Sequence, residues 1–197
     1  MSEQARWDKR YSSDELPWDT GRPDMYLVGM VSRWPLHQGK VLDIGCGTGT
    51  NSLWLAGQGF EVTGLDISKE AVDIARLRAQ DENIDCQFIC DNFLTSSFPA
   101  NSMQFIFDRG CFHSVKPEQR RDFVERAAEL LHPGGLWLSL IGNADDAEQE
   151  QGPPKLSARA VTEAMEPAFE ILYLESCMLE SRLDRPPRFW RCLLKKR

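Results

Sequence analysis

Residues 41–50, VLDIGCGTGT, decide the fold, because an apolar run containing Asp43 leads directly into glycines 45, 47 and 49. Glycine lets a chain turn tightly after a strand and lets the backbone approach a ligand with no Cβ in the way. Asp43 would lie beside this turn, where a carboxylate suits a cationic or hydrogen-bond-donating ligand group better than a pyrophosphate. The stretch therefore predicts a nucleotide-binding turn between a strand and a helix.

The glycine spacing and the following segment narrow the ligand. A dinucleotide fingerprint needs G-x-G-x-x-G/A, whereas GCGTGT gives G-x-G-x-G with Thr50 at the last fingerprint position, which favours S-adenosylmethionine over NAD. Residues 51–59 predict a short helix that closes at glycine, and residues 60–68 predict a second strand ending at Asp66, an acid suited to ribose hydroxyls. The result is a complete βαβ unit. The alternative is a glycine-rich turn that binds no ligand.

Composition limits the classes of function. The 197 residues carry 23 Lys and Arg against 30 Asp and Glu, and the net charge of −7 works against binding to nucleic acid or to acidic membranes. The chain starts without an apolar signal core and has no long apolar run, so we expect a cytoplasmic protein. Its six cysteines are scattered, which predicts neither disulfides nor a metal site.

Alternating helix and strand patterns predict an α/β fold with a Rossmann-like, doubly wound and mostly parallel sheet. Residues 1–22 carry Trp7, Tyr11 and Trp18, and we interpret them as a lid over the ligand cleft. Pro23 is expected in the first turn of a helix that Pro35 ends. Further helices are expected at 69–82, with Ser68 as its cap, at 117–131 and at 157–167, and further strands at 86–91, 103–108, 136–142, 169–176 and 188–194.

Four acids fall at or just beyond successive predicted strand ends: Asp43, Asp66, Asp91 and Asp108. Ligands of such sheets bind at the carboxyl ends of the strands. The shared placement of the four acids therefore predicts a site there.

The order of elements, the glycine turn, the acid after the second strand and the LLHPGG turn resemble class I S-adenosylmethionine-dependent methyltransferases over nearly the whole chain. The resemblance implies seven strands with the last one, 188–194, antiparallel. It also implies a single domain, 1–197, with a lid and helix in 1–35 and the Rossmann-like core in 36–197.

The resemblance also assigns site residues. The glycines at 45, 47 and 49 would approach the methionine and ribose parts of the cofactor, with Asp43 at the methionine amino group and Asp66 at the ribose. Asp108 and Arg109 would border the methyl group and the acceptor. The predicted cofactor contacts are Trp18, Asp43, Gly45, Cys46, Gly47, Gly49, Asp66, Ile67, Asp91, Asn92, Phe93 and Asp108, with Asp91, Asn92 and Phe93 at the adenine.

The phrase LPWDTGRPD, residues 16–24, is similar to the lid segment of small-molecule thiol, thiopurine and halide methyltransferases and their tellurite-resistance relatives. In this reading Trp18 covers the sulfonium, because an indole face attracts a cation and a closed lid excludes water. The alternative is ordinary packing of Trp18 on the core, which is also our interpretation of Trp7.

The predicted catalytic residues are His113, Asp108 and Arg109. His113 has a suitable pKa for a general base, but it could equally be a hydrogen-bonded structural residue. Arg109 could attract an anionic acceptor or form a salt bridge with an acid such as Asp108. The sequence DRGCFH also differs from the N/D-P-P-Y/F type found in methyltransferases of nucleic acids, and the lone Cys111 is insufficient for capture of arsenite.

We therefore expect an enzyme that transfers methyl from S-adenosylmethionine to a small-molecule thiol or other sulfur or oxygen nucleophile, leaving S-adenosylhomocysteine. One alternative is a non-catalytic protein that binds adenosylmethionine as a sensor or partner. Another is an NAD-dependent oxidoreductase. The expected assembly is a monomer or a homodimer.

Overall fold

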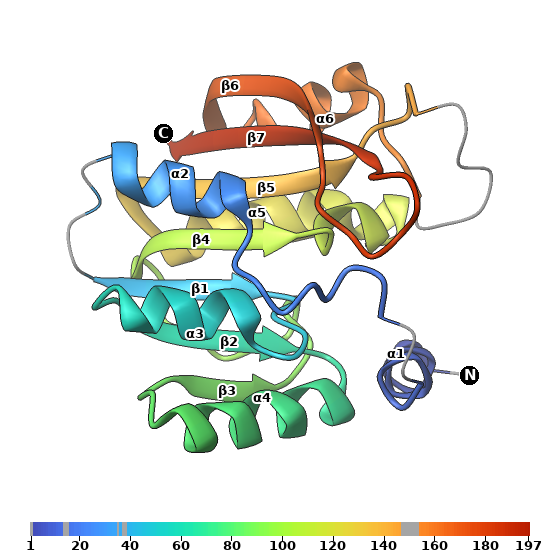
Figure 1. Cartoon of the computed structure of the whole chain (residues 1–197). Helices are drawn as coiled ribbons and strands as arrows, with labels where there is room; N and C mark the ends of the chain where they lie inside the picture. Colours follow the sequence, from blue (N-terminus) through green and yellow to red (C-terminus); the bar gives the residue numbers. More distant parts are fainter. Residues whose placement is uncertain (1, 14–15, 35, 37–38, 147–153) are drawn as a thin grey trace.

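The computed structural model describes residues 2–13, 16–34, 36, 39–146 and 154–197. A seven-stranded sheet with the order β3-β2-β1-β4-β5-β7-β6 has helices on both faces (Figure 1). The strands are β1 (Lys40–Ile44), β2 (Glu61–Asp66), β3 (Gln87–Cys90), β4 (Met103–Arg109), β5 (Leu131–Gly142), β6 (Phe169–Met178) and β7 (Arg188–Lys196). The helices are α1 (Glu3–Tyr11), α2 (Met25–Arg33), α3 (Thr50–Gly57), α4 (Lys69–Glu82), α5 (Arg120–Leu130) and α6 (Ala158–Met165), with short turns η1 (Phe112–Ser114) and η2 (Pro117–Gln119).

The direction of the last strand agrees with the expectation. β7 pairs antiparallel with both β5 and β6, while β1, β2, β3, β4 and β5 pair in parallel. The predicted Rossmann-like sheet with a reversed last strand is confirmed. The strand order reverses between β1 and β4, and in such sheets the carboxyl ends at the reversal form the ligand crevice.

Two hydrophobic layers hold the helices against the sheet. On one face α2 and α3 place Leu27, Met30 and Leu55 against inward residues such as Phe105 and Phe107, and α4 packs beside them at the β3 edge (Figure 1). On the other face α5 and α6 pack on Ile106, Trp137 and neighbours. Successive residues of β4 thus point to opposite faces, and each fully buried side chain of this size contributes about 1.5–3 kcal/mol.

Local sequence signals set most helix boundaries. The backbone N–H of Ala71 donates to the Ser68 hydroxyl at 3.3 Å, which confirms the predicted cap of α4. α2 begins after Asp24, whose carboxylate accepts from Tyr26 N–H at 2.9 Å, so the expectation that Pro23 lies in the first helical turn is wrong. Pro35, the expected end of this helix, lies outside the described residues.

Strand ends differ more from the expectation. β5 begins at Leu131 instead of 136, because backbone pairing with β4 continues, through an irregular register, across a segment that contains proline and two glycines. β6 and β7 each extend two residues further than expected, since the two strands pair with each other along their full length.

None of the helices in the described ranges has the length and apolar character that a membrane crossing requires.

Candidate active site

The glycine turn joins β1 to α3 at the switch point of the sheet. Gly45, Gly47 and Gly49 have φ of +70°, +55° and +86°, a region of backbone conformation that residues other than glycine adopt only at an energetic cost. A Cβ on Gly45 would lie 2.8 Å from the Cβ of Cys111, and one on Gly47 would lie 2.8 Å from the Tyr11 hydroxyl. Both the backbone angles and the close neighbours therefore require glycine here.

Two buried carboxylates flank the turn. Asp66, at the end of β2, accepts hydrogen bonds from Gly47 N–H at 2.9 Å and Ser68 N–H at 2.8 Å, and burial raises its pKa despite these bonds. Asp43 accepts from the Ser52 hydroxyl at 2.6 Å, and burial raises its pKa to about 7. The turn therefore carries acceptor oxygens on both sides, and its glycines add no side chain of their own between them.

Asp108 anchors the chain just after β4. Its side chain is fully buried and accepts from Cys111 N–H at 3.1 Å, Phe112 N–H at 3.0 Å and the Trp137 indole N–H at 3.0 Å. Burial raises the pKa of this carboxyl to about 6. Oδ1 thus holds the chain that leaves β4 and Oδ2 holds Trp137 of β5, and this geometry favours a structural contribution by Asp108.

The predicted adenine residues differ in orientation. Asp91 and Asn92 are exposed beyond β3, and the Asp91 carboxylate accepts from Asn92 N–H at 2.7 Å. The ring of Phe93 is buried in the core, with its centroid 4.4 Å from that of Phe123. The side chain of Phe93 thus packs on α5, which leaves Asp91 and Asn92 as the accessible side chains of the three.

Cys46 and Ile67, two further predicted cofactor contacts, lie next to the buried carboxylate of Asp66 or in the glycine turn itself. Cys46 is buried, and its sulfur lies 3.0 Å from the position of a Cβ on Gly64. Burial raises its pKa far above the usual range for a thiol. Ile67 is half-buried directly after Asp66. At both positions the backbone of the turn is therefore the group available to a ligand.

The amino-terminal lid lies over this turn. Trp7, Tyr11 and Trp18 form one aromatic cluster, with ring centroids 6.1 to 6.4 Å apart. The Tyr11 hydroxyl reaches Gly47, and Asp8 accepts from the Ser68 hydroxyl at 2.7 Å. Sequence reasoning assigned no site contact to Tyr11 or Asp8. The spacing of Trp7 and Tyr11 could have indicated that they act together, because residues four apart share one face of α1.

The second part of the lid, residues 16–24, is called the strap. Its Asp19 carboxylate accepts from the Thr48 hydroxyl at 2.6 Å and pairs with Arg78 of α4 at 3.4 Å. Burial opposes ionisation, but the Thr48 and Arg78 contacts outweigh it and lower the pKa of Asp19. The strap is thereby fixed directly to the glycine turn.

Arg109, the last residue of β4, is also engaged with the strap. Its guanidinium donates to the Asp24 carboxylate at 2.9 Å, to the Trp18 carbonyl at 2.9 Å and to the Glu180 carbonyl at 2.5 Å. The salt bridge that the sequence left open thus exists, but its partner is Asp24 and not the neighbouring Asp108, whose Oδ1 holds the following turn.

His113 lies in η1 and is only 2% exposed. Its Nδ1 accepts from Gly142 N–H at 2.6 Å, which assigns the proton of the neutral ring to Nε2. Burial, assisted by the charge of Arg120, lowers the pKa of His113 to about 4. The one lone pair of the neutral ring is therefore committed to the backbone of β5, and this favours the structural reading.

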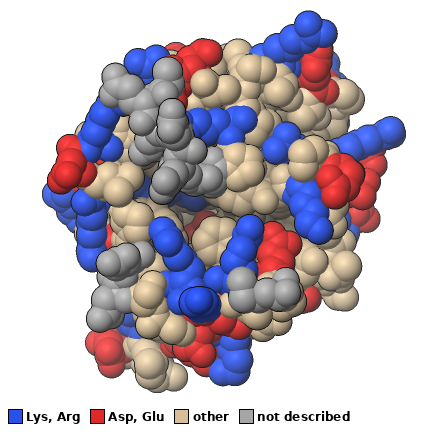
Figure 2. Space-filling view, turned by 90° about the vertical axis from the view of Figure 1, so that its right-hand side faces the viewer, with Lys and Arg blue, Asp and Glu red and all other residues tan. Residues whose placement is uncertain are grey.

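Charge and cysteine chemistry complete the site. Figure 2 shows the face that carries α1 and the carboxyl ends, with Lys and Arg side chains on several sides of a central hollow. Cys111 adjoins Gly45, and burial raises its pKa well above the usual value, so the thiol stays protonated. Within the described part of the chain, His, Cys, Asp and Glu form no cluster of three or more that could hold a metal.

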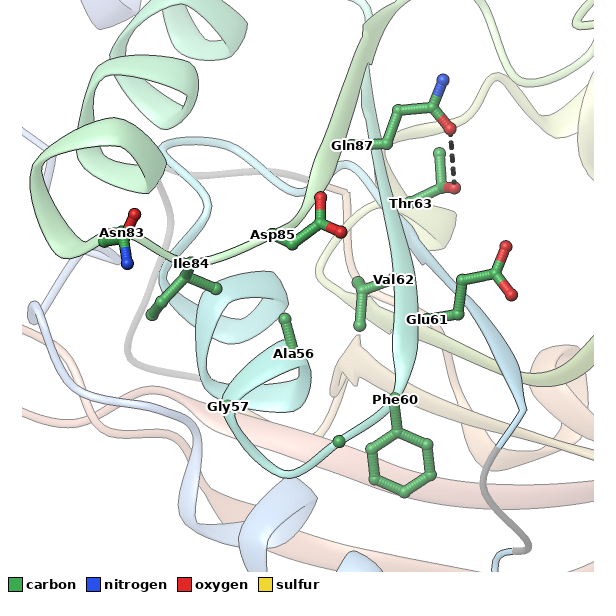
Figure 3. A pocket seen from close by; sticks show the side chains of 11 residues that line it. Ala56, Gly57, Phe60, Glu61, Val62, Thr63, Asn83, Ile84, Asp85 and Gln87 are labelled. Carbon is green, nitrogen blue, oxygen red and sulfur yellow. Dashed lines mark hydrogen bonds between the residues drawn. The ribbon is translucent and has the colours of Figure 1, made fainter.

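A different hollow, of about 680 Å³, lies at the amino ends of the parallel strands (Figure 3). It is bordered by the end of α3 and the starts of β2 and β3, and Gln87 and Thr63 share a hydrogen bond there. The lining residues are Ala56, Gly57, Gly59, Phe60, Glu61, Val62, Thr63, Asn83, Ile84, Asp85 and Gln87. Because it adjoins the amino ends of the strands, it is separate from the glycine turn.

Comparison with known proteins identifies the family. Residues 41–135 match the family model described as a methyltransferase domain. The chain is 33% identical to the probable thiol methyltransferase 2 of Arabidopsis thaliana, over 78% of this chain and 69% of that one. It is 30% identical to the thiocyanate methyltransferase 1 of Brassica oleracea, over 77% and 67% of the two chains. This chain belongs to the class I S-adenosylmethionine-dependent methyltransferases.

A solved structure shares the architecture. The 1,6-didemethyltoxoflavin-N1-methyltransferase of Burkholderia thailandensis superposes with a TM-score of 0.76 at 17% identity, over 98% of this chain and 86% of that one. Family membership makes S-adenosylmethionine the cofactor of this methyltransferase. The residues fit it, because the glycines at 45, 47 and 49 present backbone without a Cβ and Asp66 lies at the end of β2.

Proposed function

We propose that this methyltransferase acts on a small-molecule nucleophile, with a thiol or another sulfur or oxygen group as acceptor. The observation that carries the proposal is the covering of the glycine turn by the amino-terminal segment. Tyr11 lies over Gly47, and the strap contacts α4 on one side and β4 on the other. A site covered in this way suits a small acceptor better than a macromolecule. The similarity to thiol and thiocyanate methyltransferases favours sulfur.

The cofactor, when bound, supplies an electrophilic methyl group on a sulfonium. We assign the binding of its polar groups to the glycine turn, Asp43, Asp66 and the exposed Asp91. Tyr11 lies at Gly47 with Trp18 edge-on beside it, and the Arg10 guanidinium lies over the Trp18 ring, 5.1 Å from its centroid. We assign Trp18 to the sulfonium as well, since an indole face stabilises a nearby cation by about 0.5–2 kcal/mol. The aromatic cluster also excludes water, which strengthens electrostatic interactions and removes the hydration shell that would weaken an anionic acceptor as a nucleophile.

A strong general base is unnecessary in this proposal. A thiol with a pKa near 8.5 supplies a usable fraction of thiolate at neutral pH, and correct positioning then supplies much of the rate. His113 and Asp108 both hold backbone through hydrogen bonds, so we assign them to shaping the end of β4. This arrangement suits a soft nucleophile better than an alcohol, which would require proton removal.

Labelled S-adenosylmethionine with a panel of thiols, thiocyanate, halides and phenols tests the proposal. We expect transfer to at least one thiol, with a rate that rises as the thiol ionises and with formation of S-adenosylhomocysteine. A protein that binds S-adenosylhomocysteine tightly and methylates no member of the panel would contradict the proposed acceptor class. Transfer to tRNA or DNA in a parallel assay would do so as well.

The remaining expectations belong to this proposal. A cytoplasmic location and the absence of nucleic acid partners stay predictions that follow from the sequence and its charge, and an assembly of one or two copies stays a prediction as well. Light scattering during size-exclusion chromatography measures the assembly state directly.

A further inference from the structure

Two carboxylates of the strap, five residues apart, pair with arginines on different walls of the cleft. Asp19 contacts Arg78 of α4, which packs beside β2 and β3. Asp24 contacts Arg109 at the end of β4. The strap therefore crosses the reversal point of the sheet and is fixed by an ion pair on each side.

On the β4 side, Arg109 joins three segments that are distant in sequence. Its three nitrogens donate to Asp24 at the start of α2, to the carbonyl of Trp18 in the strap and to the carbonyl of Glu180 in the β6–β7 loop. The side chains of Arg109 and Asp24 are 12% and 1% exposed. Every nitrogen of the guanidinium thus has a partner, so Arg109 is built to hold protein segments.

The strap and the β6–β7 loop, residues 179–187, are joined a second time. The backbone N–H of Arg182 donates to the Pro17 carbonyl at 2.8 Å, and Arg22 forms an ion pair with Glu180. Figure 1 shows this loop descending from β6 and β7 on the edge of the sheet that holds the carboxyl ends of the parallel strands. The loop and the strap therefore form one continuous wall beside the end of β4.

On the other side, the contacts of the strap are with the glycine turn itself. Asp19 accepts from the Thr48 hydroxyl, and Arg78 donates to the same hydroxyl at 2.7 Å and to the Thr50 hydroxyl at 3.1 Å. These residues belong to the turn that approaches the cofactor. We call this side of the strap the cofactor wall. Loss of the Asp19–Arg78 pair is expected to loosen the cofactor wall and to leave the contacts with β4 in place.

We propose that Arg109 and Asp24 are positioning residues that build the acceptor wall, while Asp19 and Arg78 are positioning residues for the cofactor wall. The inference rests on the proposed small-molecule acceptor, because the wall that the strap and the loop form together has to hold it. Arg109 acts through the Trp18 and Glu180 carbonyls and does not contact the acceptor. The two ion pairs then have separable effects on the two substrates.

Three variants separate the two walls. Arg109→Lys keeps the charge, but a single ammonium group cannot replace a planar guanidinium that donates hydrogen bonds to three partners. Asp24→Asn keeps an acceptor for the cap of α2 and removes the charge opposite Arg109. For both we expect the acceptor KM to rise about ten-fold and the Kd for S-adenosylhomocysteine to change less than about two-fold. Asp19→Asn is expected to show the reverse pattern.

Arg126→Lys is the matched control. Arg126 of α5 also donates to one carboxylate, Glu129, and to two backbone carbonyls, Ser96 and Phe98, and its side chain is 17% exposed. It lies on the far face of the sheet from the strap. Its replacement is expected to lower the thermal midpoint while the KM and the Kd stay at the wild-type values.

Hydrogen–deuterium exchange gives a second measurement that needs no acceptor. With S-adenosylhomocysteine bound, Arg109→Lys is expected to speed exchange in residues 16–24 and 179–187, and Arg126→Lys is expected not to. The inference is overturned if these segments exchange as in the wild type, or if KM and Kd rise by the same factor in Arg109→Lys and Asp24→Asn. If wild-type protein methylates no acceptor, the proposed function fails, and the exchange result alone then decides whether Arg109 holds the wall.

Discussion

The cofactor side and the acceptor side of the cleft are built in different ways. Asp43, the glycine turn, Asp66 and Ser68 come from 26 consecutive residues, and the hydrogen bonds of the Asp43 and Asp66 carboxylates stay within that unit. The acceptor side combines Trp18, Arg109 and Glu180, which span most of the chain and meet through one guanidinium. Local sequence thus encodes the cofactor unit, whereas tertiary contacts assemble the acceptor wall.

The largest effect is expected from Gly45→Ala, which tests the local unit. The new Cβ would lie 2.8 Å from the Cys111 Cβ, and φ of +70° is strained for alanine, so strain and overpacking together cost about 2–5 kcal/mol. Calorimetric titration should show cofactor affinity reduced about 100-fold or more.

Gly29→Ala is the control for this substitution. Gly29 lies in α2, and a Cβ there meets no atom within 4 Å, so alanine should stabilise the helix by about 0.5–1 kcal/mol and leave affinity unchanged. Equal losses of affinity in both variants would contradict the close-approach argument.

Asp43→Asn tests the electrostatics of the same unit. Because burial raises the pKa of Asp43 to about 7 in the folded protein, the carboxyl contributes stability below its unfolded pKa near 4 and loses it as pH rises through 7. Asparagine should therefore raise the free energy of unfolding more at pH 8 than at pH 4, by up to about 4 kcal/mol, while cofactor affinity falls.

Urea unfolding at the two pH values measures this difference. Asp91→Asn, which changes an exposed carboxylate at the next strand end, is the control and should change stability by less than about 0.5 kcal/mol at both pH values. A gain from Asp43→Asn that does not depend on pH would show that folding does not raise the pKa of this carboxyl.

His113→Asn tests the acceptor side. Since burial lowers the pKa of His113 to about 4, the neutral ring contributes stability above the unfolded pKa near 6.5, and this is lost as pH falls towards 4. The loss amounts to about 3 kcal/mol. Asparagine keeps an acceptor for Gly142 N–H, so the variant should lose less stability than wild type between pH 6.5 and 4.

The same variant separates the two roles of His113. If the ring only holds Gly142, methyl transfer by His113→Asn at pH 7.5 should stay within about three-fold of the wild-type rate. A fall of about 100-fold with unchanged cofactor affinity would assign His113 as the general base.

The smallest effect is expected from Trp18→Phe. Phenylalanine presents a weaker ring face to a cation, so affinity for S-adenosylmethionine should fall by about two- to five-fold. Affinity for S-adenosylhomocysteine, which lacks the sulfonium charge, should change less. Trp7→Phe, in the same aromatic cluster, is the control, and an equal change for both ligands in Trp18→Phe would favour ordinary packing.

Much of the fold followed from short-range patterns. The first strand, the glycine turn, the cap of α4 at Ser68 and the strand ending at Asp66 all appear where expected. These features depend on hydrogen bonds and backbone angles within a few residues, which residue type controls directly. The reversed strand β7 is also present, but it followed from the family resemblance and not from its own pattern.

Other features were decided only in three dimensions. The partner of Arg109 is Asp24, the ring of His113 faces Gly142, and the ring of Phe93 faces the core. No local pattern distinguishes these outcomes from the alternatives, because each depends on a segment from another part of the chain. The sequence alone determined the cofactor unit, since its backbone angles and the hydrogen bonds of its two carboxylates are local. Tertiary structure decided the acceptor wall, since a buried arginine takes whichever carboxylate and carbonyls the packing of distant segments brings within hydrogen-bonding distance.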